Sequence, residues 1–365
     1  MTVEKKIIDA VAVIANENRY HPVCDFLNAL QWDGTERIRF CLHRFLGSDT
    51  DDYTYEALKL FLLGAISRAF KPGCKFEVML CLVGGQGAGK SSFFRLLAVN
   101  DDWFSDDLKK LDDENVYRKM QGHWIIEMSE MIATANAKSI EEIKSFLSRQ
   151  KETYKIPYET HPADRKRQCV FGGSSNTLDF LPLDRTGNRR FVPVMVYPER
   201  AEVHILADEQ ASREYINQMW AEAMEIYRSG NFRLRFSPAM NDYLKAHQKD
   251  FMPEDTKAGQ ILDYLERYSG SMVCSKQLYK EALGHDYDEP KQWELREIND
   301  IMNNAVTGWR AFSNPRYFPE PYRRQKGWER IRNDNEPDNS MDGFQEIPTE
   351  EMEQLGLPEE WLKQK

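Results

Sequence analysis

The sequence has no long apolar run and no recognisable export signal. A transmembrane helix needs about 20 consecutive apolar residues, and no stretch of this chain approaches that length. At the N-terminus, Asp9 interrupts the apolar residues and no small-residue cleavage site follows, so we expect no secretory signal. These absences argue against a membrane protein and against an exported protein, and we expect a cytoplasmic one.

Cysteine is also scarce. The 365 residues include six cysteines, at positions 24, 41, 74, 81, 169 and 274, with neither CxxC nor Cys/His ligand spacing. Disulfide frameworks and structural zinc sites usually show such spacing. The sequence therefore predicts neither, and it suits a reducing compartment.

Positive charge is in deficit overall, with 49 Lys and Arg against 59 Asp and Glu. The deficit is concentrated from residue 333 onward, where ten acids face two lysines, so the rest of the chain is nearly neutral. Two segments are basic: 144–168 has seven cations against three acids, and 310–332 has seven against two. Each segment alone suits a solvated surface equally well, but together they are compatible with a nucleic-acid channel.

One stretch, CLVGGQGAGKSSFFRLL at 81–97, contains the pattern G-x-x-x-x-G-K-[ST] of a phosphate-binding loop. An apolar segment at 76–83 predicts a buried strand before the loop, and an amphipathic helix follows it. Glycines let successive backbone N–H groups turn toward phosphates. We expect ATP phosphates to bind Gly84, Gly85, Gln86, Gly87, Ala88, Gly89, Lys90, Ser91 and Ser92. Lys90 would reach the β- and γ-phosphates, and the Ser91 hydroxyl would hold Mg²⁺.

The regions around this loop differ in pattern. Residues 73–200 alternate strands and helices, which predicts a three-layer α/β core. A helical N-terminal module precedes this core at 1–72, and a helical lid follows at 201–255. Residues 256–332 are compatible with a winged-helix DNA-binding region, and 333–365 read as an acidic, disordered tail.

Polar residues end two of the predicted strands. WIIEMSEM supplies Glu127, which we expect on the Mg²⁺ side, and Glu130, which could polarise the attacking water. Asn176 follows the strand in QCVFGGSSN, at the sheet edge where ligands of open α/β sheets bind. We expect it to orient water or to sense the γ-phosphate.

The segment DRTGNRRF presents adjacent arginines, Arg189 and Arg190, before a further strand. A guanidinium supplied by a neighbouring subunit can stabilise the charge on a transferring phosphoryl group. Adjacent residues of an extended segment point to opposite faces, so we expect only one of the two to reach a nucleotide. Surface ion pairs are an equally weighted alternative.

The segment 148–168 interleaves aromatic rings with cations. This composition is typical of a strand-binding hairpin, in which cations bind phosphates and rings contact bases. We expect DNA to contact Lys151, Lys155, Arg165, Lys166 and Arg167.

The combined motifs resemble the virulence-associated protein E family of phage- and island-encoded P-loop proteins. The matching stretches are ENRYHPVCDFLNALQWDG, KPGCKFEVMLCLVGGQGAGKSSFFRLLA, the WF at 103–104, HWIIEMSEM, EEIKSFLSRQKETYKIPY, RQCVFGGSSN and DRTGNRRFVPV. This family is similar to superfamily 3 helicases of the AAA+ class. The resemblance implies a P-loop AAA+ three-layer sandwich flanked by a helical N-terminal module and a helical or winged-helix C-terminal region.

The resemblance also implies roles for the residues. Gly84–Ser91 become the A motif, Glu127 and Glu130 the B motif region, Asn176 the sensor, and Arg189 or Arg190 the arginine finger. The B motif here is E-x-x-E rather than two adjacent acids, which leaves the catalytic glutamate open. Many relatives carry a primase domain, for which this chain has no room, so priming would come from another protein.

Two main functions follow from the sequence. The first is a Mg²⁺-dependent ATPase of a mobile element that assembles as a ring, expected to be a hexamer, and moves along DNA as a helicase, engaging single strands or forks. The alternative is an ATP-switched DNA-binding protein that recruits replication or virulence partners without unwinding. A small-molecule kinase is the weakest hypothesis, because no phospho-acceptor pocket is apparent and the basic segments would have no role.

Overall fold

The computed structural model describes residues 3–18, 20–108, 111, 116–130, 137–154, 163–183 and 188–331. Contacts divide the chain into two compact units, Met1–Asp255 and Thr256–Lys365. Within the described ranges, no helix is both long enough and apolar enough to span a membrane. The predicted tail from 333 lies outside these ranges.

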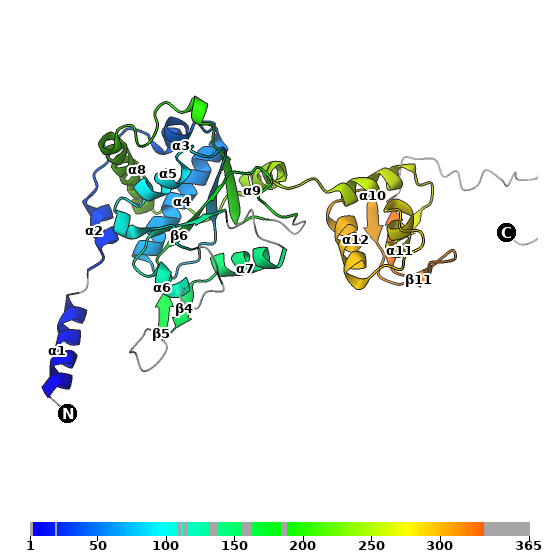
Figure 1. Ribbon diagram of the computed structural model, residues 1–365, viewed down its shortest axis with the longest axis horizontal. Helices are drawn as coiled ribbons and strands as arrows, with labels where there is room; N and C mark the ends of the chain where they lie inside the picture. The colour runs from blue at the N-terminus through cyan, green and yellow to red at the C-terminus, as the bar shows by residue number, and fades with distance from the viewer. Residues whose placement is uncertain are drawn as a thin grey trace, which may run out of the picture. The chain divides into compact units, whose positions relative to one another are not determined.

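A five-stranded parallel sheet forms the centre of the first unit (Figure 1). The strands are β1 (Met79–Val83), β2 (Phe104–Ser105), β3 (Ile125–Ser129), β6 (Val170–Ser175) and β7 (Phe191–Met195). Their order across the sheet is β2-β3-β6-β1-β7. The strand before the phosphate loop, β1, is therefore separated from the acid-bearing strand, β3, by one other strand, β6.

Helices surround this sheet in the first unit. They are α2 (Pro22–Ala29), α3 (Ile38–Leu46), α4 (Asp52–Phe70), α5 (Lys90–Leu97), α6 (Val116–Met120), α7 (Ala137–Leu147), α8 (Glu209–Ser229) and α9 (Pro238–His247). No described side chain of an earlier helix, α1 (Val3–Glu17), joins the cores around the sheet, and its apolar residues Ile7, Val11 and Ile14 are exposed. Side-chain caps set several of the helix starts. The Asp51 carboxylate accepts the Thr54 N–H at 2.8 Å before α4, and Asp208 accepts the Ala211 N–H at 3.0 Å before α8.

The strands are apolar on both faces, as expected for a parallel sheet covered by helices. Leu80 and Leu82 of β1 join the core that includes side chains of α3, α4, α5 and α8. Met79, Cys81 and Val83 alternate with them and join the core formed with α6 and α7 on the other face. The first unit is therefore a three-layer α/β structure, as the alternation of strands and helices predicted.

Close packing explains one glycine of β6. A Cβ at Gly172 would lie 2.4 Å from the ring of Phe94, a residue of α5 that is fully buried. Only a residue without a side chain lets this ring rest directly on the sheet. The helix that begins at the phosphate loop is thereby held against β6.

The helices before and after the predicted core belong to the same unit as the sheet. Side chains of α3, α4 and α8 share one hydrophobic core with β1 and β7. The Trp220 indole of α8, for example, donates to the Leu97 carbonyl of α5 at 3.0 Å. Helices from both flanking regions therefore contribute side chains to the core of the sheet unit.

The second unit has its own core, built from α10 (Thr256–Arg267), α12 (Gln292–Asn304) and a three-stranded antiparallel sheet. The sheet order is β8-β12-β9, with β8 at Met272–Cys274, β9 at Trp309–Ala311 and β12 at Gly327–Arg330. The remaining elements are α11 (Ser275–Gln277), η4 (Leu278–Ala282), β10 (Arg316–Phe318) and β11 (Arg323–Gln325). Along the chain, helix α10 and strand β8 are followed by three helical segments, α11, η4 and α12, and then by strands β9 to β12.

Candidate nucleotide site

The predicted phosphate loop joins the carboxyl end of β1 to the first residue of α5. Gly87 and Gly89 have φ values of 80° and 79°, in the region that side chains rarely adopt. A Cβ at Gly84 would lie 2.5 Å from the Val196 carbonyl oxygen. The backbone conformation favours glycine at Gly87 and Gly89, and close packing requires glycine at Gly84. The backbone of the loop is thereby left accessible.

Lys90, the first residue of α5, turns its ammonium back over the loop. Its Nζ donates to the carbonyls of Gly84 at 2.7 Å and Gly85 at 2.8 Å, and to Asn176 Oδ1 at 2.9 Å. Burial lowers the Lys90 pKa, and the charges of Glu130 and Glu127 act in the opposite direction. The cation is thus held at the loop by neutral acceptors that an anionic ligand could replace.

Glu127 lies next to the loop and is completely buried. Its Oε1 accepts the hydroxyl of Ser91 at 2.7 Å and the hydroxyl of Ser174 at 2.6 Å. Its Oε2 is buried without a hydrogen-bond partner. A buried carboxylate oxygen without a donor is costly unless a cation or a ligand completes it.

These groups fit a Mg²⁺ ion. Magnesium sites typically combine one or two carboxylates with a hydroxyl, water and substrate phosphates, rather than a cage made by protein alone. Ser91 and Glu127 supply such a set, and the orphaned Glu127 Oε2 is the observation that favours a cation. Among the described residues, no group of three or more His, Cys, Asp or Glu could hold a metal ion by itself.

Asn176 and Glu130 meet at the same sheet edge. The backbone of Glu130 has a φ of 52°, and its N–H donates to the Ser174 carbonyl at 3.0 Å. Its carboxylate accepts the Asn176 N–H at 3.1 Å, while the Asn176 side chain accepts from Lys90. The structure therefore brings the predicted acids and the predicted sensor together beside the loop.

Sequence reasoning missed Ser174 as a member of this site. Its hydroxyl holds Glu127 from the neighbouring strand. The available signal was the pair of hydroxyl residues in VFGGSSN, which ends the strand at the same edge as Asn176. The sequence could not show that β6 lies directly beside the acid-bearing strand.

The two candidate arginines lie at the amino-terminal ends of the strands, whereas the phosphate loop lies at their carboxyl ends. Phe191 pairs with Met79 and Met195 with Val83, so Arg190 precedes the first paired residue. At about 3.3 Å per residue, Arg190 lies about 20 Å along the strand direction from the level of the loop. Neither arginine can serve the loop of its own chain.

Both arginines form ion pairs with the Glu77 carboxylate. The Arg189 guanidinium lies 3.0 Å from Glu77 Oε1, and Arg190 Nε lies 3.6 Å from Glu77 Oε2. Arg190 Nε also donates to the Ser148 hydroxyl at 2.9 Å. The Arg189 side chain is 68% exposed and that of Arg190 is 21% exposed, so Arg189 is the more accessible to a partner.

The predicted DNA-binding segment forms an antiparallel hairpin of β4 (Lys151–Tyr154) and β5 (Ala163–Lys166). Lys166 is exposed, Arg165 is half-buried, and Lys151 is ion-paired with Asp164. Lys155 lies outside the described residues. The hairpin therefore presents some of the predicted cations on its surface.

Arg167 does not match the expectation of a DNA contact. Its guanidinium is fully buried, ion-paired with Glu152, and donates to the Phe146 carbonyl at 2.7 Å. It also lies over the Phe146 and Phe171 rings, 4.7 and 5.1 Å from their centroids. These contacts anchor the root of the hairpin, and we therefore leave Arg167 out of the proposed DNA surface.

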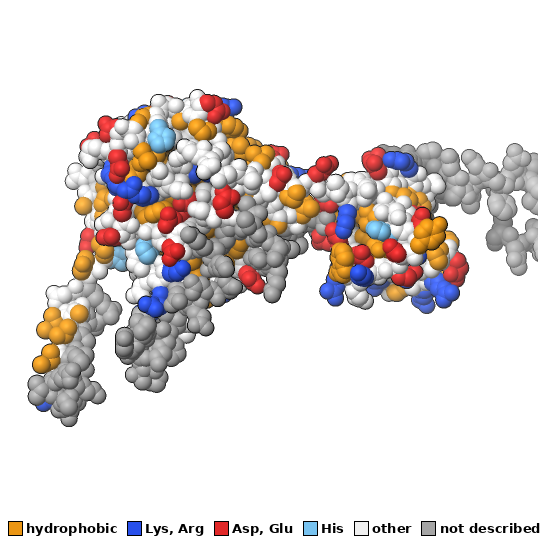
Figure 2. All heavy atoms as spheres, in the orientation of Figure 1, with side chains coloured by type: hydrophobic (Ala, Val, Ile, Leu, Met, Phe, Trp, Pro, Cys, Tyr) orange, Lys and Arg blue, Asp and Glu red, His pale blue; other side chains and the backbone are white. Residues whose placement is uncertain are grey.

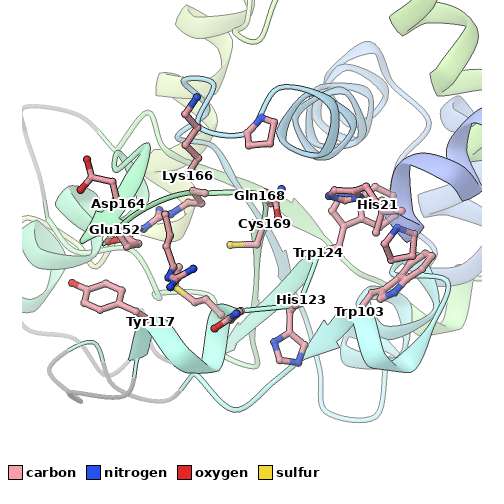
Figure 3. A pocket seen from close by; sticks show the side chains of 18 of the residues that line it. His21, Trp103, Tyr117, His123, Trp124, Glu152, Asp164, Lys166, Gln168 and Cys169 are labelled. Carbon is pink, nitrogen blue, oxygen red and sulfur yellow. Dashed lines mark hydrogen bonds and ion pairs between the residues drawn. The ribbon is translucent and has the colours of Figure 1, made fainter. Parts of the chain in front are cut away.

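A cavity of about 700 Å³ lies at the amino-terminal edge of the sheet, away from the phosphate loop (Figure 3). Residues that precede β2, β3 and β6 line it, among them Trp103, His123 and Cys169, and Lys166 of the hairpin reaches its rim. It combines aromatic, acidic and basic side chains. This mixture does not define one ligand, so we assign the cavity no role.

No curated protein matches the chain significantly. Similar solved structures include two of the apo C-terminal region of NrS-1, 13% and 14% identical, with TM-scores of 0.48 and 0.46. Each covers 84% of this chain and 78% of the NrS-1 chain. The model of one family, the virulence-associated protein E-like domain, matches residues 27–253. The chain therefore belongs to the virulence-associated protein E-like family.

Proposed function

We propose that this chain is a Mg²⁺-dependent ATPase of AAA+ organisation that moves along DNA as a ring. One observation carries the nucleotide part: Lys90, Ser91, Glu127 and Asn176 meet at the carboxyl edge of a parallel sheet, around a glycine loop. Open α/β sheets bind their ligands at this edge. An unpartnered buried oxygen of Glu127 in the same place supports a metal-bound nucleotide over an uncharged ligand.

Each residue has a role in this proposal. The loop N–H groups and the α5 N-terminus would bind the α- and β-phosphates, and Lys90 would exchange its carbonyl acceptors for phosphate oxygens. Ser91 and Glu127 would hold Mg²⁺, which neutralises charge on the β- and γ-phosphates. Glu130 would accept a proton from the attacking water, and Asn176 would orient that water.

The arginines would act between subunits. Because Arg189 and Arg190 lie far from their own loop, hydrolysis that depends on either one requires a neighbouring copy. The exposure of Arg189 supports it as the residue that reaches across. A ring brings each loop to the arginine edge of the next subunit, and we propose a hexamer.

The DNA part rests on the hairpin of β4 and β5. Lys166 is an exposed cation on a two-stranded ribbon, which suits contact with backbone phosphates, and a phosphate would compete with Asp164 for the exposed Lys151. Family membership in a virulence-associated group is compatible with replication of a mobile element, with a primase supplied by another protein.

The decisive experiment combines hydrolysis with strand displacement on a labelled fork. We expect wild type to hydrolyse ATP with Mg²⁺ and to release one strand, and Lys90→Ala to do neither. The matched control is Lys249→Ala, which removes an exposed lysine of the same unit outside the site. Full activity of Lys90→Ala would refute the nucleotide site.

The same experiment separates the motor from an ATP-switched DNA-binding protein. The observation that favours such a switch is the compact second unit, whose helices and antiparallel strands suit DNA binding without movement. DNA-stimulated hydrolysis with no displacement at any fork would support the switch. If the mass of the protein in solution, with ATP and DNA both present, were that of a single subunit, the proposed ring would be refuted.

A further inference from the structure

The second unit offers two candidate DNA-binding elements. In helix-turn-helix proteins, a recognition helix enters the major groove and the adjoining elements contact the backbone. The equivalent helix here is α12, and the strands that follow it form a wing, which we define as residues 309–330. Helix α12 and the wing differ in the sign of their net charge.

Helix α12 is acidic. It contains Glu294, Glu297 and Asp300, with Arg296 as its one cation. Glu297 pairs with Lys257 of α10 at 2.7 Å, so part of this charge is balanced within the unit. A helix with net negative charge is repelled by the phosphates that flank a groove.

The wing is basic. It has two carboxylates, Glu320 and Glu329, and six cations: Arg310, Arg316, Arg323, Arg324, Lys326 and Arg330. Figure 2 shows Lys and Arg side chains gathered at the edge of the second unit where Figure 1 labels β11.

The two carboxylates of the wing form ion pairs with only some of its six cations. Glu329 binds Arg310 at 2.8 Å and Arg316 at 2.7 Å, and Glu320 lies 3.3 Å from Arg323. Across the described ranges, neither Arg324 nor Lys326 forms an ion pair, and both are exposed. Two cations of the wing are therefore available to an external anion.

An exposed aromatic ring accompanies these cations. Tyr317 is 67% exposed and pairs across the hairpin with Arg324, so the two side chains share one face. Phe318, the next residue, points to the other face and is 2% exposed. Exposure of Tyr317 is thus set by the strand register and not by loose packing.

The wing is firmly anchored beneath this face. Phe318 packs with Phe312 and Cys274, and the Tyr322 hydroxyl donates to Glu281 of η4 at 2.6 Å. A Cβ at Gly327 would lie 2.1 Å from the Val273 carbonyl oxygen, so β12 approaches β8 as closely as glycine allows. A rigid ribbon presents Tyr317 and Arg324 without a large cost in side-chain ordering.

We propose that the wing, rather than helix α12, is the nucleic-acid contact of the second unit, and that it binds single-stranded DNA. Arg324 and Lys326 hold backbone phosphates, and Tyr317 stacks on an unpaired base. Stacking requires a free base face, which a duplex does not offer. This contact is independent of ATP hydrolysis and separate from the β4–β5 hairpin.

The test uses the full chain without nucleotide and a fluorescein-labelled oligothymidylate. We expect Tyr317→Ala to weaken binding about tenfold with an unchanged salt slope. The double variant Arg324→Gln, Lys326→Gln should reduce the salt slope by about 1.4, since each single-strand phosphate contact contributes about 0.7. The matched controls, Tyr287→Ala and Arg296→Gln, should bind as wild type does.

Photo-crosslinking keeps the result independent of other DNA sites on the chain. With 5-iododeoxyuridine in the strand, we expect a crosslinked peptide from residues 309–330 that is lost in Tyr317→Ala. Crosslinks confined to other segments would overturn the proposal, as would a loss of binding in Arg296→Gln. Equal weakening of single strand and duplex by Tyr317→Ala would overturn the stacking contact. If the full chain bound polyglutamate through the wing but did not bind DNA there, the partner of the wing would be an acidic protein instead.

Discussion

The hydrogen bond from Lys90 to Asn176 bears on the proposed nucleotide site, because removal of Asn176 should have opposite effects on nucleotide binding and on turnover. Lys90 Nζ donates to two loop carbonyls and to Asn176 Oδ1. A phosphate can bind the ammonium only when some of these acceptors are exchanged. In Asn176→Ala one of the three is already absent, so less is lost when a nucleotide binds.

The size of this effect follows from the exposure of the two groups. A hydrogen bond to a charged group contributes about 1.5–3 kcal/mol when both partners are buried. Lys90 is 7% exposed, but Asn176 is exposed, so water replaces the lost amide in part. We take about 1 kcal/mol, which corresponds to about fivefold tighter binding.

The assay uses ADP with Mg²⁺, because ADP lacks the γ-phosphate that Asn176 would sense. Calorimetry of Asn176→Ala should show about fivefold tighter ADP binding, while its ATP turnover falls at least about tenfold. Asn176→Asp is the counterpart, because a carboxylate would hold Lys90 more strongly and repel phosphate, so ADP binding should weaken. Weaker ADP binding in Asn176→Ala would refute the reasoning.

Three further predictions concern other parts of the first unit. Arg189→Ala should lower ATP turnover and leave ADP affinity unchanged, with a smaller effect for Arg190→Ala, whose guanidinium is less exposed; unchanged turnover in both would remove the inter-subunit site. The double variant Lys151→Gln, Lys166→Gln should reduce the salt slope of single-strand binding by about 1.4, and an unchanged slope would move that contact elsewhere. Burial lowers the pKa of His247, whose ring packs against neighbouring aromatic rings, so protonation favours the unfolded chain. Stability measured by urea unfolding should therefore fall as pH drops below about 6.5, and His247→Phe should lose that component of the pH dependence.

The sequence predicts where the glycine loop lies and which side chains end the neighbouring strands. The pattern from Gly84 to Ser91 encodes backbone geometry directly, since it requires glycine where φ is positive or where a carbonyl approaches. Glu127 and Asn176 could also be found, because each ends an apolar run and parallel strands end at one edge. These predictions need only periodicity and the chemistry of phosphate binding.

Contacts between distant segments could not be predicted in this way. Arg167 and Lys166 are adjacent cations, yet one is buried under two rings and the other is exposed. Composition does not distinguish them, because their environments depend on how the hairpin root packs against α7 and β6. Likewise the amphipathic pattern of α8 predicts a buried stripe, but not that Trp220 reaches α5 in the core of the sheet unit.

The position of β6 has a mechanical consequence. Its carboxyl end carries Ser174 and leads into Asn176, which bind the Glu127 carboxylate and the Lys90 ammonium, and its amino end lies a few residues after the hairpin. Strand β6 is hydrogen-bonded to β1 on one side and to β3 on the other. If the proposed nucleotide cycle displaces Asn176, this strand is the covalent route from that displacement to the hairpin. Under the proposed function, this six-residue strand would connect the residue that senses phosphate to the hairpin that contacts DNA.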